Sequence, residues 1–415
     1  MSEKKQPATA SRGLSRATAA ILTMAFLGFV FTAFGVMVTG DFDGLRKSVQ
    51  LTDERLAQLP KGAGALDRLS ARINGFTSEI ADAMWLKTEL GYANSAFQYA
   101  LGKRMINTGS QNMVRLNTGH LYDLNPYKDL TGNAADIIEL RNTALKDYPF
   151  LFVYEHPTLY SDDMMPAGYD ALDASARMAD EATSALRAGG VEVLDSRDIL
   201  PRSGHDLNDL LLVTDQHWST LAAITMARSV AEKVNEMTGS SLDPALLDPD
   251  QLNTLRHEAL FIGKYGQRLG PGQVTPDDIT EYWPRTDTHI HRLTRHVKRV
   301  VEQDGPFREA VTRFEVLETP EGQSWNETAY MLYGLTEAYS IFTNEAAPDT
   351  TILLLKDSYG APIGTFLSLL ARNVVCVDLR QDVDPLETWL SEYQPDAVVM
   401  AYSLQMLRDD NYAFE

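Results

Sequence analysis

The 415-residue sequence contains a single cysteine, Cys376. One thiol cannot form an intrachain disulfide. It lies within an apolar run typical of a β-strand, so we expect a buried small side chain and not a reactive group. The fold must therefore be held by its hydrophobic core, which a chain of this length can supply.

An excess of positive charge is also missing. The sequence has 37 Lys and Arg against 57 Asp and Glu, a formal net charge of −20. Binding a nucleic-acid backbone requires clustered Lys and Arg, so no nucleic-acid partner is expected. The acidity favours solubility and says nothing about a reaction. No internal repeat or low-complexity tract is evident, and the hydrophobic content of 44% is ordinary for a globular protein.

Residues 17–38 carry no charged side chain and are long enough to span a bilayer as a helix. Four basic residues precede this segment: Lys4, Lys5, Arg12 and Arg16. Positive charge on that side predicts a cytoplasmic N-terminus, residues 1–16, with the remaining chain outside the membrane. The alternative is a cleaved signal peptide. In either case the main domain is exported.

Residues 41–111 show apolar side chains at three- and four-residue intervals, interrupted at Pro60 and at residues 62–64. This pattern predicts a membrane-proximal helical stalk. The main domain is expected over residues 112–415, with a less regular insertion at about 240–345 that covers a sheet edge or shapes a pocket.

Pairs of apolar runs separated by a helical pattern occur twice in that domain, at 150–194 and at 351–380. Short β-rich runs on either side of a helix (170–187 in the first pair) are typical of a β-α-β unit. The runs are almost wholly apolar, as in parallel strands buried on both faces. With a further helix at 386–393 and strand at 397–402, the pattern predicts an α/β fold. The expected sheet is parallel, flavodoxin-like and flanked by helices.

The polar turn containing Ser358 lies between the apolar run 351–355 and a helical segment. In open parallel sheets, ligands bind where strands end and helices begin. Unpaired backbone N–H groups and the positive end of the helix would favour developing negative charge there. Ser358 is therefore either a nucleophile or a helix cap.

A second polar segment, Thr214-Asp215-Gln216-His217-Trp218-Ser219-Thr220, precedes a helical run at 221–237 and is expected, like Ser358, at a strand-to-helix junction of the sheet. A serine hydroxyl needs a base, and the pKa of histidine suits that task. A carboxylate on the other ring nitrogen fixes the tautomer. The alternative is that Asp215 and Ser219 cap the helix while His217 and Trp218 pack against the core.

This segment, together with Leu355-Lys356-Asp357-Ser358-Tyr359-Gly360, resembles the DHHW proteins. These are related to SGNH-hydrolase-like proteins of the AlgX and AlgJ type, which O-acetylate alginate and other exported polysaccharides. The resemblance runs from about 112 to 403. Three further stretches match the same pattern: residues 119–122, 261–268 and 282–284.

The resemblance implies an SGNH-like α/β domain in which Ser358 is the nucleophile, His217 the base and Asp215 its orienting acid. The order, with the Asp-His motif before the Ser motif, is that of the family. The four-residue signature here reads Asp-Gln-His-Trp, so Gln216 occupies its second position. Lys356 is expected to be a solvated strand-end lysine.

Stabilisation of an oxyanion requires aimed donors, for which the backbone N–H of Ser358 and a neighbour at the helix start are candidates. Four side chains are further candidates for oxyanion or substrate binding: Tyr359, Tyr402, His156 and Trp218. For Tyr402, packing is the alternative.

A histidine cluster, His289, His291 and His296, offers a competing interpretation as a metal site. Zinc needs three or four ligands, no cysteine is near, and the neighbouring carboxylates are unremarkable. We expect no metal and no cofactor.

The sequence together with the resemblance predicts a membrane-anchored, extracytoplasmic, serine-dependent O-acetyltransferase that modifies a polysaccharide through an acyl-serine intermediate. Its acetyl donor is expected to be a membrane-bound O-acyltransferase. Two alternatives stay open: a carbohydrate acetylesterase using the same three residues, and a non-catalytic polysaccharide-binding or assembly component.

Overall fold

A computed structural model describes residues 96–97, 99–107, 112–296, 299–321, 323, 325–334 and 337–408. These residues lie in one compact unit of the chain. None of the helices in this part has the length and apolar character needed to cross a bilayer. The predicted membrane segment, 17–38, and most of the predicted stalk lie outside the described residues.

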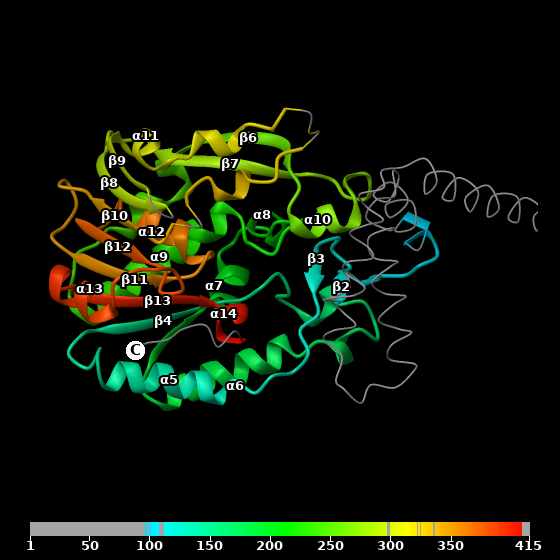
Figure 1. Ribbon diagram of the computed structural model, residues 1–415, viewed down its shortest axis with the longest axis horizontal. Coiled ribbons are helices and arrows are strands. Elements are labelled where there is room, and N and C mark those ends of the chain that lie inside the picture. Colours follow the sequence, from blue (N-terminus) through cyan, green and yellow to red (C-terminus); the bar gives the residue numbers. More distant parts are fainter. Residues whose placement is uncertain are drawn as a thin grey trace, which may run out of the picture. The chain divides into compact units, whose positions relative to one another are not determined.

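Eight strands of the described chain form a central sheet in the order β5-β4-β13-β11-β12-β10-β8-β9 (Figure 1). Their bounds are β4 (Phe150–Glu155), β5 (Glu192–Asp195), β8 (His289–His296), β9 (Arg299–Pro306), β10 (Tyr339–Thr343), β11 (Thr351–Lys356), β12 (Asn373–Val377) and β13 (Ala397–Ser403). Two small sheets accompany it: β1 (Met105–Asn107), β2 (Asn112–Arg115) and β3 (Leu121–Asp123); and β6 (Leu252–Phe261) with β7 (Asp277–Pro284).

The helices connect these strands or cover the faces of the sheet. Their bounds are α5 (Thr131–Asn142), α6 (Ser175–Ala188), α7 (Ser196–Ile199), α8 (Leu207–Leu210), α9 (Thr220–Thr238), α10 (Lys264–Leu269), α11 (Phe307–Val311), α12 (Gly360–Leu367), α13 (Leu386–Tyr393) and α14 (Leu404–Arg408).

The prediction of a purely parallel sheet was wrong at one edge. Strands β5, β4, β13, β11 and β12 run parallel. Strand β10 pairs antiparallel with β12 and with β8, and β9 pairs antiparallel with β8. A hairpin such as β8–β9 needs no crossover helix, so it can extend an edge that the β-α-β units leave unpaired. The sheet is therefore mixed.

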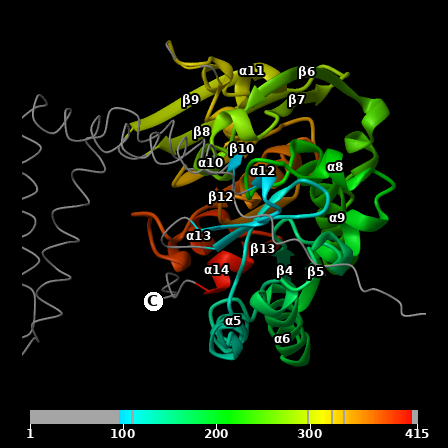
Figure 2. The same ribbon diagram turned by 90° about the vertical axis from the view of Figure 1, so that its right-hand side faces the viewer.

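Alternate residues of the buried strands contribute to two cores, one on each face of the sheet. On β11, Ile352 and Leu354 belong to a cluster with α9 and α12, whereas Leu353 and Leu355 belong to a cluster with α5, α6, α13 and α14. Figure 2 shows α5 and α6 on one side of the sheet and α9 on the other. This period-2 alternation in nearly all-apolar strands gives a three-layer α/β/α arrangement.

Most of the predicted elements in the parallel part of the sheet are present. Strand β4, helix α9, strand β11 and helix α13 lie within a residue or two of their predicted bounds. The predicted helix at 170–187 begins later, at Ser175, because Asp173 accepts hydrogen bonds from Asn125 N and Tyr122 Oη and so fixes the preceding turn. Helix α5 was not predicted, since its five apolar residues among twelve do not form a clear apolar face.

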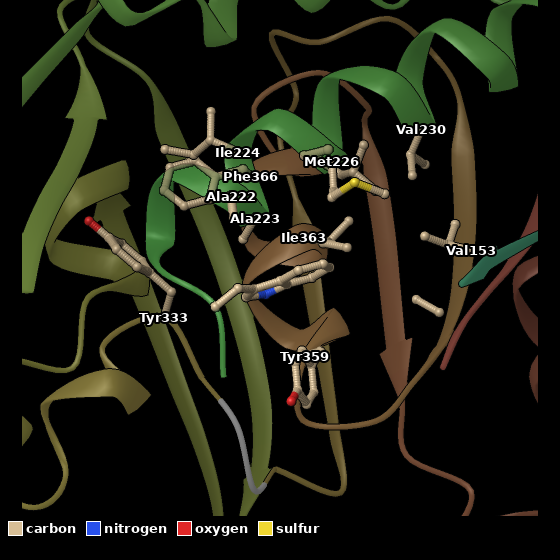
Figure 3. Close-up of a cluster of buried hydrophobic side chains, with 14 of the residues drawn as sticks. Val153, Ala222, Ala223, Ile224, Met226, Val230, Tyr333, Tyr359, Ile363 and Phe366 are labelled. Carbon is tan, nitrogen blue, oxygen red and sulfur yellow. The ribbon is translucent and has the colours of Figure 1, made fainter. Parts of the chain in front are cut away.

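Helix α12, which follows Ser358, packs closely against the sheet and against α9 (Figure 3). A Cβ atom at Gly364 would lie 2.2 Å from Cys376 Sγ on β12 and 2.9 Å from Leu354 Cδ2 on β11. Cys376 is buried, as predicted, and burial raises the pKa of its thiol to about 12. Glycine at 364 therefore sets how near the helix lies to the strands.

We expect Gly364→Ala to lower the free energy of unfolding by about 1–3 kcal/mol, because the added methyl group displaces α12 from β12. Urea denaturation measures this change. Gly132→Ala in the exposed part of α5, where a Cβ meets nothing within 4 Å, is the matched control and should stabilise by about 0.5–1 kcal/mol. Adding Cys376→Ala to Gly364→Ala should restore part of the loss. A loss that this second change leaves untouched would contradict the proposed clash.

Candidate functional site

Ser358 lies in the turn between β11 and α12, at the carboxyl end of the parallel strands. The carboxylate of Asp357 shapes this turn, because its Oδ1 accepts a hydrogen bond of 2.9 Å from the backbone N–H of Tyr359. Its Oδ2 accepts a second, of 2.8 Å, from the backbone N–H of Ser403 at the end of β13. The turn is thus tied to the neighbouring strand, and Ser358 stays partly exposed.

The segment that carries His217 is a turn closed by an isolated bridge between Leu211 and Trp218, followed by α9. It does not follow a strand of the central sheet, so the prediction of a strand-to-helix junction was wrong for this motif. Ser219 caps α9, accepting from the N–H of Ala222. The predicted capping role therefore holds for Ser219 and not for Asp215, whose carboxylate binds His217.

The structure brings Ser358, His217 and Asp215 together. His217 Nε2 lies 2.9 Å from Ser358 Oγ, and His217 Nδ1 lies 2.7 Å from Asp215 Oδ1. Since the carboxylate can only accept, Nδ1 carries the ring proton and Nε2 accepts the hydrogen bond from the serine hydroxyl. This is the arrangement in which a serine can lose its proton to a histidine.

Asp215 is held in its ionised form although it is buried. Burial opposes the charge, but hydrogen bonds from His217 and from the backbone N–H of Lys264 outweigh it and lower the pKa of this carboxyl below its ordinary value. The backbone of Gly263 lies so near that a Cβ there would be 2.3 Å from Asp215 Cβ. The segment at the start of α10 therefore surrounds the acid and allows no side chain at 263.

A second aspartate, Asp277 at the start of β7, holds the same turn. Its oxygens accept hydrogen bonds from Val213 N at 2.6 Å, from Thr214 N at 2.9 Å and from the Thr214 hydroxyl. Burial raises the pKa of Asp277 to about 6, against the effect of these donors. Asp277 therefore holds the histidine turn through Val213 and Thr214, and none of these bonds involves Ser358.

Two tyrosines flank the imidazole of His217. The ring centroids of Tyr330 and Tyr359 lie 4.9 Å and 4.8 Å from that of His217. The Tyr359 hydroxyl donates a 2.6 Å hydrogen bond to the backbone carbonyl of Gln216, and its backbone N–H donates to Asp357. Both donors of Tyr359 are thus bound within the protein, and its role is to join the serine turn to the histidine turn.

Ser358 opens into a cavity of about 280 Å³. Tyr122, Gln216, Tyr265 and Arg380 are among the residues that line it. The guanidinium of Arg380 is held by two hydrogen bonds to Asp378. The lining is mainly polar and aromatic, which suits a hydroxyl-rich ligand more than an apolar one.

Of the four predicted binding residues, Tyr359 lines this cavity, whereas Trp218, His156 and Tyr402 do not. Trp218 packs edge-on against Tyr359 and lines a separate pocket of about 470 Å³. His156 is buried and lies 3.0 Å from Tyr154 Oη through Nδ1; burial lowers its pKa to about 3, so the ring is neutral. Tyr402 is fully buried in the core on the α5 and α6 face, as in the packing alternative.

His289 and His291 lie along β8, and both face Asp304 on β9, with nitrogen-to-oxygen distances of 3.0 and 3.6 Å. Within the described residues, no three potential metal-ligating side chains gather at one point. The side chain of His296 lies outside that description.

Several residues around the site escaped the sequence reasoning. Tyr330 and Asp277 come from the irregular segment 240–345, whose pattern does not indicate what they contact. Lys356 was expected in solvent, but it is buried and its Nζ donates to the Glu337 carbonyl at 3.1 Å. Glu155 could have been noticed from the sequence, because a carboxylate at the end of an otherwise apolar, buried strand needs a hydrogen-bonding partner.

Comparison with known proteins supports the predicted resemblance. Residues 151–292 match the family described as SGNH hydrolase-like domain, acetyltransferase AlgX. The matched segment includes Asp215 and His217 and ends before Ser358. No curated protein matches the chain in sequence.

Solved structures of similar fold include a DHHW family protein from Eubacterium siraeum DSM 15702, 18% identical, with a TM-score of 0.55 over 74% of this chain and 95% of that one. Bacillus cereus PatB1 with a sulfonyl adduct is 13% identical, with a TM-score of 0.58 over 74% and 99%. The O-acetyltransferase domain of Pseudomonas putida AlgJ is 13% identical, with a TM-score of 0.43 over 72% and 93%. The first two show a shared fold.

The raised pKa of Asp277 predicts a pH dependence of stability. A carboxyl whose pKa is raised in the folded state, here from 3.8 to about 6, resists ionisation there, so its stabilising effect is complete at low pH. The free energy of unfolding of the wild type, relative to Asp277→Asn, should therefore fall as pH rises from about 4 to 6.5, by up to about 3 kcal/mol. Denaturant titrations at each pH measure it. Parallel curves for the two proteins would contradict the raised pKa.

Proposed function

We propose, from the premise that residues 151–292 match an SGNH hydrolase-like domain of the AlgX acetyltransferase type, that this chain is a serine-dependent O-acetyltransferase that modifies a polysaccharide. The observation that carries the proposal is the continuous hydrogen-bonded series from Asp215 through His217 to Ser358, with distances of 2.7 and 2.9 Å. An alcohol, a base and an orienting acid are the parts that acyl transfer through a serine requires.

In the first half-reaction, His217 Nε2 takes the proton of the Ser358 hydroxyl as Oγ attacks the acetyl carbonyl carbon of the donor. Asp215 keeps the ring oriented and stabilises the imidazolium that forms. The tetrahedral intermediate then collapses, the bond to the leaving group breaks, and His217 returns the proton to that group. The acetyl group remains as an ester on Ser358.

In the second half-reaction, a sugar hydroxyl in the cavity gives its proton to His217 and attacks the acetyl carbonyl. Collapse of this intermediate breaks the ester bond to Ser358 Oγ, which recovers its proton from His217. The acetylated sugar leaves. Atoms and charge balance over the cycle, and no cofactor takes part.

The oxyanion of both intermediates needs a hydrogen-bond donor next to Ser358. Because both donors of Tyr359 are bound elsewhere in the protein, we assign this role to the backbone N–H of Ser358. The N-terminal end of α12, an eight-residue helix, adds a favourable dipole at the same point.

The polar cavity supports a polysaccharide acceptor, since side-chain amides such as that of Gln216 line it and can exchange hydrogen bonds with sugar hydroxyls. The charge pattern around residues 17–38 supports a location outside the cytoplasmic membrane, with a membrane-bound O-acyltransferase as donor. The same three residues would serve an acetylesterase if water replaced the sugar in the second step.

Labelling with an aryl sulfonyl fluoride tests the nucleophile. Such a reagent forms an ester with a serine only when a base activates the hydroxyl, and intact-protein and peptide mass spectrometry locate it. We expect one adduct, on Ser358, and a labelling rate at least about 1,000-fold lower in His217→Ala. Ser219→Ala removes a hydroxyl of the neighbouring motif and should still be labelled. An unlabelled wild type, or equal rates in His217→Ala, would leave only a scaffold role.

The acceptor of the second half-reaction distinguishes a transferase from an esterase. The full chain receives an aryl acetate with and without an oligosaccharide, and both products are measured by mass spectrometry. A transferase gives acetylated sugar, at a rate that rises with oligosaccharide concentration. Free acetate at the same rate in both mixtures would identify an esterase. Ser358→Ala should abolish either product.

A further inference from the structure

A second acidic residue lies next to the serine turn and takes no part in the proposed mechanism. Glu155 is the last residue of β4, is fully buried, and stands in register with Ser403 on β13. Within the described residues, neither of its carboxyl oxygens receives a hydrogen bond from any donor. A carboxylate without donors is among the most costly groups to bury, so its protonation state needs an explanation.

The carboxylate of Asp357 lies beside Glu155, because Asp357 Oδ2 accepts a hydrogen bond from the backbone N–H of Ser403, the residue that pairs with Glu155 across the β4–β13 ladder. Asp357 already accepts hydrogen bonds from the backbone N–H groups of Tyr359 and Ser403, one on each carboxyl oxygen, so both oxygens serve as acceptors. Two ionised carboxylates in contact would repel each other inside the protein. A single proton on Glu155 turns this repulsion into a hydrogen bond.

Of the two carboxyl groups, Glu155 is the one whose surroundings favour the protonated form. Burial raises the pKa of Glu155 well above its ordinary value, and the charge of Asp357 raises it further. Lys356 and Arg380 act in the opposite direction, but Lys356 also faces Glu337, and Arg380 forms an ion pair with Asp378. Tyr160, in the loop after β4, is a neutral phenol near Glu155, because burial raises the pKa of its hydroxyl; the Asp195–Arg197 ion pair on β5 and α7 also acts on this phenol.

We propose that Glu155 is a protonated carboxylic acid at neutral pH that donates a hydrogen bond to the Asp357 carboxylate and thereby positions the turn that carries Ser358. Glu155 is a positioning residue, since no hydrogen bond among the described residues joins it to Ser358 or His217. Its proton completes the hydrogen bonding of Asp357, which accepts from the Tyr359 N–H and so shapes the turn that carries the Ser358 N–H. The kinetic part of this inference rests on the proposed function, whereas the protonation state does not.

Difference infrared spectroscopy tests the protonation directly. The full-length wild type minus Glu155→Gln should show, at neutral pH, the carbonyl band of a protonated carboxylic acid. Glu337→Gln is the matched control: Glu337 is equally buried, but Lys356, Arg292 and Arg313 lower its pKa despite burial, so its replacement removes no such band. A wild-type spectrum without that band overturns the proposal, whatever the activity.

The positioning role is tested with two replacements of similar size. Glu155→Gln keeps a donor for Asp357, and its sulfonyl labelling rate at Ser358 should stay within a few-fold of the wild type. Glu155→Leu removes the donor, and its labelling rate should fall by about 10- to 100-fold, because a small displacement of the nucleophile is costly. Circular dichroism confirms that each variant is folded. Equal rates in the folded Gln and Leu variants would overturn the positioning role.

The pH profile separates this role from simple packing. The labelling rate of the wild type should decline at alkaline pH as Glu155 ionises, and Glu155→Gln, which cannot ionise, should lack that decline. Identical alkaline profiles would count against the proposal. If instead Ser358 is never labelled in any protein, the proposed function fails while the infrared band still decides whether Glu155 holds a proton.

Discussion

The 2.9 Å contact between His217 Nε2 and Ser358 Oγ is the interaction on which the chemistry of this protein depends. It joins residues 141 positions apart, and neither turn could hold it alone. The parallel strands have their carboxyl ends on the same side of the sheet. Ser358 lies there because it follows the end of β11, which runs between β12 and β13. The histidine turn reaches the same place from the start of α9, which packs on the helix that follows Ser358.

The histidine turn is fixed from two sides. Asp277 on β7 binds its backbone, and the segment from Gly263 to Lys264 surrounds Asp215. Both supports come from residues 240–345, so this segment does more than cover the sheet. Its antiparallel strands extend the sheet, and its Tyr330 lies against the imidazole. A polar site at the edge of an apolar core needs such support, because each of its groups must keep one orientation.

Carboxyl groups illustrate how environment separates chemically identical side chains. Asp215 is buried yet ionised, because donors surround it, whereas burial dominates at Asp277 and Glu155 and raises their pKa values. The sequence shows three acids near polar turns and cannot rank them. The donors and charges that the fold brings to each one decide which is charged: Asp215 faces the imidazole of His217, whereas Asp277 faces the carboxylate of Asp215. Lys356 shows the same limit: at a strand end it was expected in solvent, yet it lies in a buried cluster of charges.

The sequence by itself determined the strands β4, β11 and β13, the helix α9 and the burial of Cys376, because periodicity reports burial within one element. It also singled out Asp215, His217 and Ser358 as candidates, whose catalytic roles followed from the family resemblance. Tertiary structure alone decided the antiparallel edge, the convergence of the three side chains, and the pairing of Glu155 with Asp357. These depend on strand order and register between distant segments, which no local pattern encodes.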